Sequence, residues 1–426
     1  MNKLDLSSAY VLTVGDIILD KFYLGKVSRI SPEAPVPIVQ INEQRYALGG
    51  AGNVVNNIAH LGAASYLIGI VGKDSNRDIT KKLLKDINIE SKLFETENPT
   101  TTKIRVIGEH QQVVRLDFES TQEIGYSLQE KIEKEIDNCI TNVGALTISD
   151  YGKGLCCFDL CQYMIKKAKH ADIPLIVDPK GCNWDKYKGA TIITPNIKEF
   201  GQVVGKEIIN ENEEIEKYGI DVINKLNLEY LLITRSEKGM SLISENGCYH
   251  IPTEAIEVYD VSGAGDTVVG TIATALASGL TMLESVQLSN TAAGIVVQKF
   301  GTAPIEIDEL LHSLHTHGDS KIITQDVLPR IIKHLSKKNN RIIFTYGEFD
   351  FLNLKDLHFL KEIREKGDKL IIGFNYPIKD KIHDALIELI SNLEFVDYLV
   401  TYNNITLPLF LSSIPEDVTI INRGDQ

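Results

Sequence analysis

Four short apolar segments in the middle of the chain each end in a polar or glycine-containing turn. They span residues 145–150, 174–178, 191–194 and 230–234, with helix-like segments between them. Strands that alternate with helices in this way form parallel sheets with helices on both faces. Polar side chains gather where these strands end, and ligands bind at that edge of α/β proteins. The sequence therefore predicts an α/β fold with a site along one edge of the sheet.

Length and composition fit two folded domains. The chain has 426 residues, of which 43% are apolar and 24% charged, so one large and one smaller domain are expected. The net charge of −14 argues against nucleic acid or an anionic membrane as the main partner. Neither a membrane-spanning apolar stretch nor a signal-peptide core is recognisable, so we expect a cytoplasmic protein.

A glycine-rich turn near residue 260 opens into an apolar helix, and residues 260–267 read D-V-S-G-A-G-D-T. The backbone N–H groups of Gly263, Ala264 and Gly265 can close around an anion at the positive end of the helix. A carboxylate in the first helical turn would repel a bound phosphate, so Asp266 indicates chemistry beyond anion binding. It is placed to take a proton from a hydroxyl while the turn holds a phosphoryl group. The alternative, a capped helix after a glycine turn, accounts less well for the whole string.

Polar residues near the N-terminus suit a sugar hydroxyl. Asp16 follows the apolar run 10–15, with Asp20 nearby, and Gly49-Gly50 precede a helix that contains Asn53. Glycine lets a ligand approach the backbone, and an amide side chain offers a donor and an acceptor. Asn56 competes with Asn53 for this role, and we favour Asn53. For Asp16 the alternative is a cap on a turn.

Residues 103–119 alternate in polarity around a polar turn, which predicts a β-hairpin. With the 20–45 region it could form a small sheet that stands off the main body. Three prolines between residues 32 and 37 exclude a helix there and predict an extended segment. Arg105 and Arg115 lie on the hairpin. They are either ordinary surface charges or ligands for a phosphorylated substrate, since guanidinium binds phosphate with two hydrogen bonds.

Two clusters of metal-ligand residue types are better explained without a metal. Cys156, Cys157 and Cys161 lack a second ligand pair, so we expect reduced thiols. His312, His315 and His317 also lack a partner cluster. We interpret them as part of a solvated linker.

The D-V-S-G-A-G-D-T string resembles the signature of the ribokinase-like (PfkB) carbohydrate kinases, which transfer the γ-phosphate of ATP to a sugar hydroxyl. The resemblance covers roughly the first three quarters of the chain. It implies a ribokinase-like parallel sheet flanked by helices, with a small β lid that often pairs with a second subunit, so a homodimer is expected. By this resemblance Asp266 is the catalytic base, and Asp16, Gly49, Gly50 and Asn53 bind the sugar.

The same resemblance assigns the nucleotide side of the site. Asn196 and Glu199 match the element that organises the phosphates and Mg²⁺, mostly through water. Thr234 and Gly239 resemble the nucleotide-side loop. Asn290 would line the adenine pocket, with a structural role in its helix as the alternative. Asp260 would help to shape a monovalent-cation site, with K⁺ as the ion.

A narrower resemblance concerns three segments: R-I-S-P-E-A-P-V-P at 29–37, V-R-L-D-F-E at 114–119 and D-P-K-G at 178–181. They are similar to the branch that phosphorylates C1 of D-glycero-β-D-manno-heptose 7-phosphate on the route to ADP-heptose for lipopolysaccharide. Lys180 and Arg115 would then contact the phosphate already on the sugar. A kinase for another sugar, and a non-catalytic sugar-binding protein, are the alternatives.

We expect the kinase domain over residues 1–317 and a second α/β domain over 318–426. Residues 345–373 resemble the start of the nucleotidyltransferase domain fused to many heptose kinases, in which a turn carries two histidines. Asn353 and Asp356 stand at those positions; asparagine cannot become cationic, and aspartate would repel a triphosphate. The chain also ends before a later nucleotide-binding segment, so we expect a truncated, degenerate domain without transferase activity. Dimerisation, stability and binding of a separate adenylyltransferase are its open roles, and a bifunctional kinase and adenylyltransferase is the alternative.

Overall fold

The computed structural model forms two compact units, residues 1–306 and 307–426. It describes residues 4–109, 111–253, 258–299, 301–317, 321–323, 325, 328–337, 340–347, 354–375, 381–402, 411, 414–415 and 418–423. The division falls ahead of the boundary predicted at residue 317, because helix α9 (Ile307–His317) belongs to the second unit. The linker prediction was wrong for residues 312–317, which are helical. The side chains of His312, His315 and His317 lie outside the described part.

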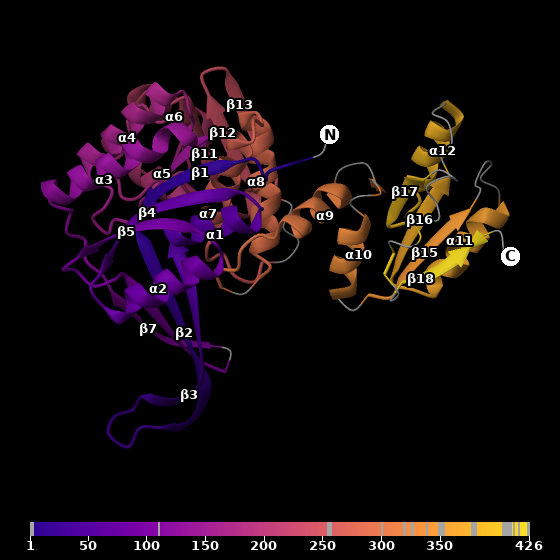
Figure 1. The fold of residues 1–426 in the computed structure, drawn as a ribbon, viewed down its shortest axis with the longest axis horizontal. Coiled ribbons are helices and arrows are strands. Elements are labelled where there is room, and N and C mark those ends of the chain that lie inside the picture. Colours follow the sequence, from indigo (N-terminus) through magenta and orange to yellow (C-terminus); the bar gives the residue numbers. More distant parts are fainter. Residues whose placement is uncertain are drawn as a thin grey trace. The chain divides into compact units, whose positions relative to one another are not determined.

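Nine strands form the large sheet of the first unit, in the order β13-β12-β11-β10-β9-β8-β1-β4-β5 (Figure 1). Pairing is parallel from β11 to β5 and antiparallel among β11, β12 and β13. This confirms the predicted α/β fold. The strands are β1 Tyr10–Gly15, β4 Ala64–Gly72, β5 Glu90–Thr96, β8 Ala145–Ser149, β9 Leu175–Asp178, β10 Ile192–Ile193, β11 Tyr230–Thr234, β12 Met240–Ser244 and β13 Gly247–Ile251.

Helices cover both faces of this sheet because buried side chains alternate along its strands. Leu12 and Val14 of β1 pack in one core with α3, α4 and α6, whereas Val11 packs in a second core with α1, α7 and α8. The helices are α1 Ala51–His60, α2 Ser75–Asp86, α3 Tyr126–Cys139, α4 Phe158–Ala171, α5 Ile197–Val204, α6 Asn212–Leu226, α7 Ala264–Ala277 and α8 Met282–Val296, with short 3₁₀ turns η1 Ile140–Asn142, η2 Asp185–Tyr187 and η3 Ser236–Lys238.

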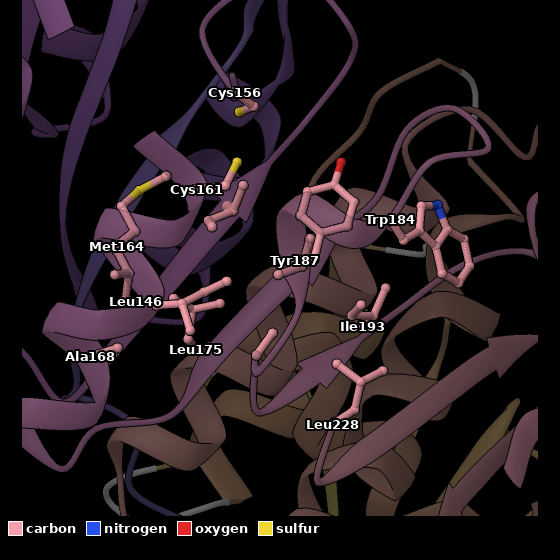
Figure 2. Packing of buried hydrophobic residues seen from close by; sticks show 14 of the residues in the cluster. Leu146, Cys156, Cys161, Met164, Ala168, Leu175, Trp184, Tyr187, Ile193 and Leu228 are labelled. Atoms are coloured by element: carbon pink, nitrogen blue, oxygen red, sulfur yellow. The ribbon is translucent and has the colours of Figure 1, made fainter. Parts of the chain in front are cut away.

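The three clustered cysteines belong to the first of these cores. Figure 2 shows Cys156 and Cys161 in the same cluster as Leu146, Met164 and Tyr187. Cys156, Cys157 and Cys161 are buried and free. Of the two alternatives to a metal site, buried or incidental thiols, the structure favours buried thiols.

A second sheet of four strands, in the order β3-β2-β6-β7, forms the predicted lid. Its strands are β2 Ile17–Ile30, β3 Pro37–Gly50, β6 Thr102–Gly108 and β7 Gln111–Phe118. The hairpin predicted at 103–119 is confirmed as β6 and β7. The prediction of an extended segment at 32–37 was wrong, because residues 31–36 form the turn between β2 and β3. The Ser31 N–H donates to the Val36 carbonyl over 2.8 Å to close this turn, and the hairpin projects from the body of the unit in Figure 1.

The second unit is a smaller α/β domain, as predicted. Its five strands, in the order β14-β17-β16-β15-β18, pair in parallel, with apolar clusters on both faces. The elements are β14 Ile322–Ile323, α10 Leu328–Lys337, β15 Ile342–Gly347, α11 Leu354–Glu365, β16 Lys369–Asn375, α12 Lys381–Ser391, β17 Tyr398–Tyr402 and β18 Thr419–Asn422. Among the residues described in either unit, no helix is long and apolar enough to cross a bilayer.

Candidate active site

The candidate site lies where the carboxyl ends of β1, β8 and β9 meet the N-terminus of α7. Asp16 directly follows β1, Asp150 and Tyr151 follow β8, and Asp178 ends β9. Neighbouring parallel strands end at the same edge of a sheet, which brings these side chains together. Asp266, in the first turn of α7, lies among them.

The Asp266 carboxylate is buried and held by two hydrogen bonds. The Asn53 amide donates to Oδ2 over 2.8 Å, and the Tyr151 hydroxyl donates to Oδ1 over 2.8 Å. Burial raises the pKa of Asp266 to about 7, against the opposing effect of the two donors. A carboxyl with a pKa near neutrality suits proton transfer at physiological pH. The geometry therefore fits Asp266 as a general base.

Three charged groups face Asp266. Asp20 raises its pKa and Lys103 lowers it. Asp178 is the third group. Its own pKa is raised well above the usual value by burial, and further by the negative charges of Asp266 and Glu199. Carboxylates gathered in this way disfavour one another's ionised forms until a cation enters.

The turn before α7 leaves room for an anion. Gly263 is the N-cap residue with φ 82°, and a Cβ on it would lie 2.7 Å from the Asn53 amide nitrogen. At Gly265, by contrast, a Cβ would meet nothing within 4 Å. The backbone at Gly265, in the first helical turn, thus borders open space, and the N–H groups at the start of a helix attract anions. This agrees with the predicted phosphoryl-binding role of Gly263, Ala264 and Gly265.

Asp16 holds a turn rather than presenting a free carboxylate. Its oxygens accept hydrogen bonds from the backbone N–H groups of Tyr151 and Lys153, each over 2.9 Å, and of Leu155 over 3.3 Å. The structure favours the turn-capping alternative over the predicted hydroxyl-binding role. The reason is that parallel neighbours β1 and β8 bring Asp16 under the loop that follows β8.

Gly49 and Gly50 are required by close packing. A Cβ on Gly49 would lie 2.5 Å from Asp20 Oδ2, and one on Gly50, where φ is 57°, would lie 2.5 Å from the Asp16 carbonyl oxygen. The helix that follows places Asn53, not Asn56, against Asp266. The geometry supports the choice of Asn53.

Cationic side chains of the lid converge on the same region. Arg105 forms an ion pair with Asp20 and lies over the Phe22 ring, 5.4 Å from its centroid. Arg115 pairs across the strands with Arg105, and its guanidinium makes two hydrogen bonds of 2.9 Å to Asp117.

Two lysines complete this cationic group, and sequence reasoning did not single them out. Burial lowers the pKa of Lys103, whose surroundings include Asp20, Arg115 and Lys153. Lys153 forms an ion pair with Glu119 over 2.8 Å. The alternation of the hairpin could have indicated Lys103, since it shares a strand face with Arg105 two residues on.

Lys180 contacts the predicted nucleotide side of the site. Its ammonium pairs with Glu199 over 3.0 Å. Glu199 and Asn196 form a capping box at the start of α5, and Asn196 bridges to Thr234. Asn196, Glu199 and Thr234 are therefore brought together as predicted, whereas the contact of Lys180 and Arg115 with one substrate phosphate stays a prediction.

Gly239 and Asn290 have structural partners of their own. A Cβ on Gly239, where φ is 79°, would lie 2.1 Å from the Ile251 carbonyl oxygen, so glycine is needed for the tight β11–β12 connection. Asn290 is buried, and its amide donates to the Pro252 carbonyl over 2.8 Å. Both positions thus have structural roles, which for Asn290 is the alternative named above.

Asp260 braces the loop before α7. Its oxygens accept hydrogen bonds from the N–H groups of Ser262 over 2.9 Å and Gly301 over 3.0 Å. Burial would raise its pKa, but these hydrogen bonds and the positive charge of Arg105 lower it on balance. An ionised carboxylate at this place fits the cation site predicted for Asp260.

Asp16, Asp150 and Cys156 place one ligand atom each within 4.8 Å of one another, a spacing compatible with a metal. The Asp16 oxygens, however, accept from three backbone N–H groups, and Asp150 pairs with the Lys186 ammonium. The Lys186 ammonium thus already supplies a positive charge at this cluster, and the three residues do not fit a metal centre.

Comparison with known proteins decides the family. The model of the pfkB family of carbohydrate kinases matches residues 8–309. The chain belongs to the PfkB family. It is an ATP-dependent carbohydrate kinase.

PfkB relatives match over both units. The "Bifunctional protein HldE" of Haemophilus ducreyi is 39% identical, covering 99% of this chain and 90% of that protein. The protein of the same name from Pasteurella multocida is 37% identical over the same shares. The alignment thus includes the C-terminal unit.

Solved structures of PfkB enzymes share the fold of the first unit. Escherichia coli phosphofructokinase-2 in complex with potassium superposes with a TM-score of 0.61 at 21% identity, covering 71% of this chain and 96% of that one. Arabidopsis thaliana ribokinase with ribose and ATP gives a TM-score of 0.56 at 18% identity, covering 72% and 98%. These likenesses confirm the predicted ribokinase-like fold.

In the C-terminal unit of this PfkB protein, Asp356 lies in the first turn of α11 and is buried. Arg423 forms an ion pair with it. The predicted counterpart Asn353 lies outside the described residues. The described part of the turn thus carries a carboxylate whose charge an arginine neutralises.

Replacing Gly263 with alanine should disturb the base through Asn53. The new Cβ would displace the amide that holds Asp266, and a misplacement of about 1 Å can lower kcat about 10²-fold. Sugar-kinase rates would measure the effect. Gly205→Ala is the matched control, because Gly205 has φ 81° with nothing within 4 Å of an added Cβ, so it isolates the backbone strain. Equal rates for the two variants would contradict the prediction.

Proposed function

We propose that this kinase transfers the γ-phosphate of ATP to C1 of D-glycero-β-D-manno-heptose 7-phosphate, giving the 1,7-bisphosphate on the route to ADP-heptose. The observation that carries the proposal is the buried Asp266 carboxylate at the head of α7, held by Asn53 and Tyr151 beside an open glycine turn. The narrower choice of sugar is supported by the heptose-kinase motifs and by relatives named bifunctional HldE. A cytoplasmic location is part of the proposal.

In the reaction, the C1 hydroxyl oxygen forms a bond to the γ-phosphorus while Asp266 takes the proton of that hydroxyl. The bond between that phosphorus and the β–γ bridging oxygen breaks, and ADP leaves with the electron pair. The N–H groups of Gly263, Ala264 and Gly265 stabilise the charge on the transferring phosphoryl group. Asn53 and Tyr151 keep the carboxylate oriented, so that proton transfer and attack occur from one geometry.

Asp178 and Glu199 suit a Mg²⁺ that accompanies ATP, because each offers carboxylate oxygens and their mutual repulsion would be relieved by a cation. When bound, the metal neutralises charge on the phosphates. Lys180, paired with Glu199, is assigned to the same phosphates. Asp260 would hold a monovalent cation. Escherichia coli phosphofructokinase-2, which has this fold, has been solved with potassium.

The lid supports a substrate that is already phosphorylated. Lys103, Arg105, Arg115 and Lys153 form a cationic group beside Asp266. Three of the four already pair with carboxylates, and a phosphate would compete for them through charge-assisted hydrogen bonds that a neutral sugar does not offer.

The lid also supports self-association. The whole of β7 is exposed at an edge of its sheet, including Val113, Val114, Leu116 and Phe118. Uncovered apolar edge strands invite pairing with another chain. We propose a homodimer through this strand, and a monomer in sedimentation at micromolar concentration would remove the idea.

A second candidate function, nucleotidyl transfer by the C-terminal unit, is favoured by the relatives named bifunctional that match across 99% of the chain. Asp356 counts against it, since a carboxylate stands where a cationic side chain would stabilise the triphosphate. The pairing with Arg423 neutralises that charge but also occupies the arginine.

Asp266→Asn should abolish formation of the 1,7-bisphosphate from Mg²⁺-ATP and the heptose 7-phosphate. Loss of a general base lowers kcat about 10²–10⁴-fold, as measured by phosphorus NMR and mass of the product. In the wild type, kcat should rise with pH through about 7, because the base acts when deprotonated. Wild-type protein that binds ATP but forms no product would remove the heptose assignment. An Asp266→Asn variant that stays active would rule out Asp266 as the general base.

Arg115→Ala should raise the KM for the sugar phosphate about 10- to 100-fold, the effect of losing a hydrogen bond to a charged group. Its effect on the KM for ATP should be small. Arg45→Ala is the matched control, because Arg45 is on the same lid and bonds Glu43 two residues before it, much as Arg115 bonds Asp117. An unchanged sugar-phosphate KM in Arg115→Ala would withdraw its role.

Pyrophosphate release from ATP and the heptose 1-phosphate tests the C-terminal unit directly. We expect none, because the first turn of α11 presents Asp356. Release that persists in Asp266→Asn, and so does not depend on the kinase site, would establish the second candidate function instead.

A further inference from the structure

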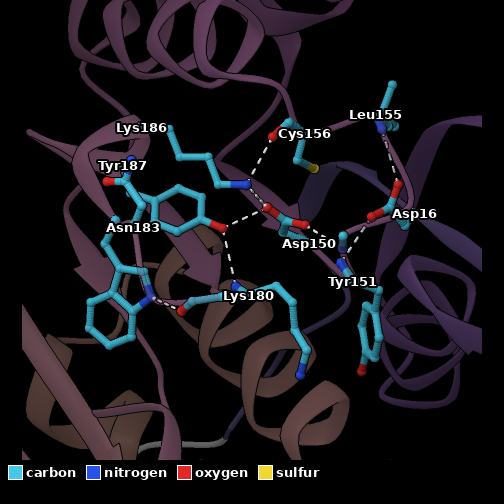
Figure 3. A network of polar contacts seen from close by, with 12 residues as sticks. Asp16, Asp150, Tyr151, Leu155, Cys156, Lys180, Asn183, Lys186 and Tyr187 are labelled. Carbon is cyan, nitrogen blue, oxygen red and sulfur yellow. Dashed lines mark hydrogen bonds and ion pairs between the residues drawn. The ribbon is translucent and has the colours of Figure 1, made fainter. Parts of the chain in front are cut away.

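A buried polar cluster next to Tyr151 has no part in the mechanism above. Its centre is Asp150, only 2% exposed. Asp150 accepts hydrogen bonds from the Gly152 N–H over 2.7 Å and from the Tyr187 hydroxyl over 2.6 Å. It also forms an ion pair with Lys186. Figure 3 shows Asp150 between the Lys186 and Tyr187 side chains on one side and the turn that begins at Tyr151 on the other.

Lys186 contacts both ends of the turn between Asp150 and Cys156. Its ammonium contacts Asp150, the residue before Tyr151, and donates to the Cys156 carbonyl over 3.1 Å. Burial lowers its pKa, but the negative charge of Asp150 more than offsets this and raises it. Lys186 therefore stays charged across the working pH range.

Tyr187 anchors the cluster in the apolar core. It is fully buried, and Figure 2 shows its ring in the hydrophobic cluster of the first unit. Its hydroxyl donates to Asp150 and accepts from the Lys180 N–H over 3.2 Å. The loop after β8 is thus tied to the loop after β9.

Asp16 fixes the turn from the opposite side through the N–H groups of Tyr151, Lys153 and Leu155. Two buried carboxylates, Asp16 and Asp150, therefore bracket one short turn. Unpaired buried charges are costly; the Lys186 ammonium compensates Asp150, and three backbone N–H groups compensate Asp16. Breaking the cluster should release the turn.

We infer that Asp150, Lys186 and Tyr187 are positioning residues for phosphoryl transfer: they hold the turn that carries Tyr151, and the Tyr151 hydroxyl orients the Asp266 carboxylate. The inference rests on the proposed role of Asp266. Tyr151 is a rigid side chain with few rotatable bonds, so the place of its hydroxyl follows from the backbone of the turn. A supporting layer of this kind determines how precisely a reacting group is held.

The test compares Tyr151→Phe, Tyr187→Phe and Lys186→Met with wild type in the full chain. Tyr187→Phe removes one oxygen and keeps the packing, so it remains informative where Lys186→Met fails to fold. Lys167→Met is the matched control. Lys167 pairs with Asp137 over 2.5 Å and lies over Tyr163, an equivalent trio on α3 and α4 outside the site.

Tyr151→Phe should lower kcat about tenfold or more and move the acid limb of the kcat profile to higher pH. The sign follows because the lost hydrogen bond favours the ionised carboxylate. The other charged groups facing Asp266, namely Asp20, Lys103 and Asp178, are unchanged in these variants. Tyr187→Phe and Lys186→Met should move both quantities in the same direction, and Lys167→Met neither.

A double variant separates positioning from general stability. If Tyr187 acts through Tyr151, Tyr151→Phe/Tyr187→Phe should be no slower than Tyr151→Phe alone. Additive losses of kcat in the double variant would overturn the inference. So would Tyr187→Phe and Lys186→Met proteins that fold and keep the wild-type kcat and acid limb. In either case an inactive Asp266→Asn would leave the proposed function in place. Full activity in Asp266→Asn would overturn the proposed function itself.

Discussion

The burial of one carboxylate organises the first unit. Asp266 is held away from water by two donors from different parts of the chain, Asn53 at the start of α1 and Tyr151 after β8. Burial raises its pKa to about 7, which suits a base that must lose and regain a proton near neutrality. The α7 turn, the two glycines before α1 and the loop after β8 must all keep their places for this arrangement to persist.

Buried charge recurs around that carboxylate, and three of the neighbouring carboxylates have a compensating partner. Asp16 accepts three backbone N–H groups, Asp150 faces Lys186, and Asp20 faces Arg105. A buried charge without such partners would be costly. The partners come from distant parts of the chain, so the contacts that compensate these charges also hold the loops of the site in place. The lid contributes to both through Arg105.

The sequence predicted these elements unequally. Alternating apolar runs and the D-V-S-G-A-G-D-T string indicated the sheet, the α7 turn and Asp266, because local periodicity and turn chemistry encode them. Asn53, favoured over Asn56 as the sugar-binding amide, is the one that contacts Asp266, and its sugar contact stays a prediction. Lys103, Tyr151 and Lys186 were overlooked as site residues. Their roles depend on neighbours more than thirty residues away, as in the contact of Lys186 with Asp150.

By itself, the sequence determined the α/β class, the lid hairpin, the glycine turn and the acid in it, since each depends on residues close together in the chain. The tertiary structure alone decided what each carboxylate does. Asp16, Asp150 and Asp266 all follow or adjoin glycine-containing turns. The pairing of β1 with β8 places Asp16 against the backbone N–H groups of a turn. The turn η2 places the Lys186 ammonium against Asp150. Asp266 meets two neutral side-chain donors, Asn53 and Tyr151, beside the open glycine turn. The three carboxylates therefore differ in the groups that contact them. Contacts across the edge of a sheet are fixed only when its strands pair.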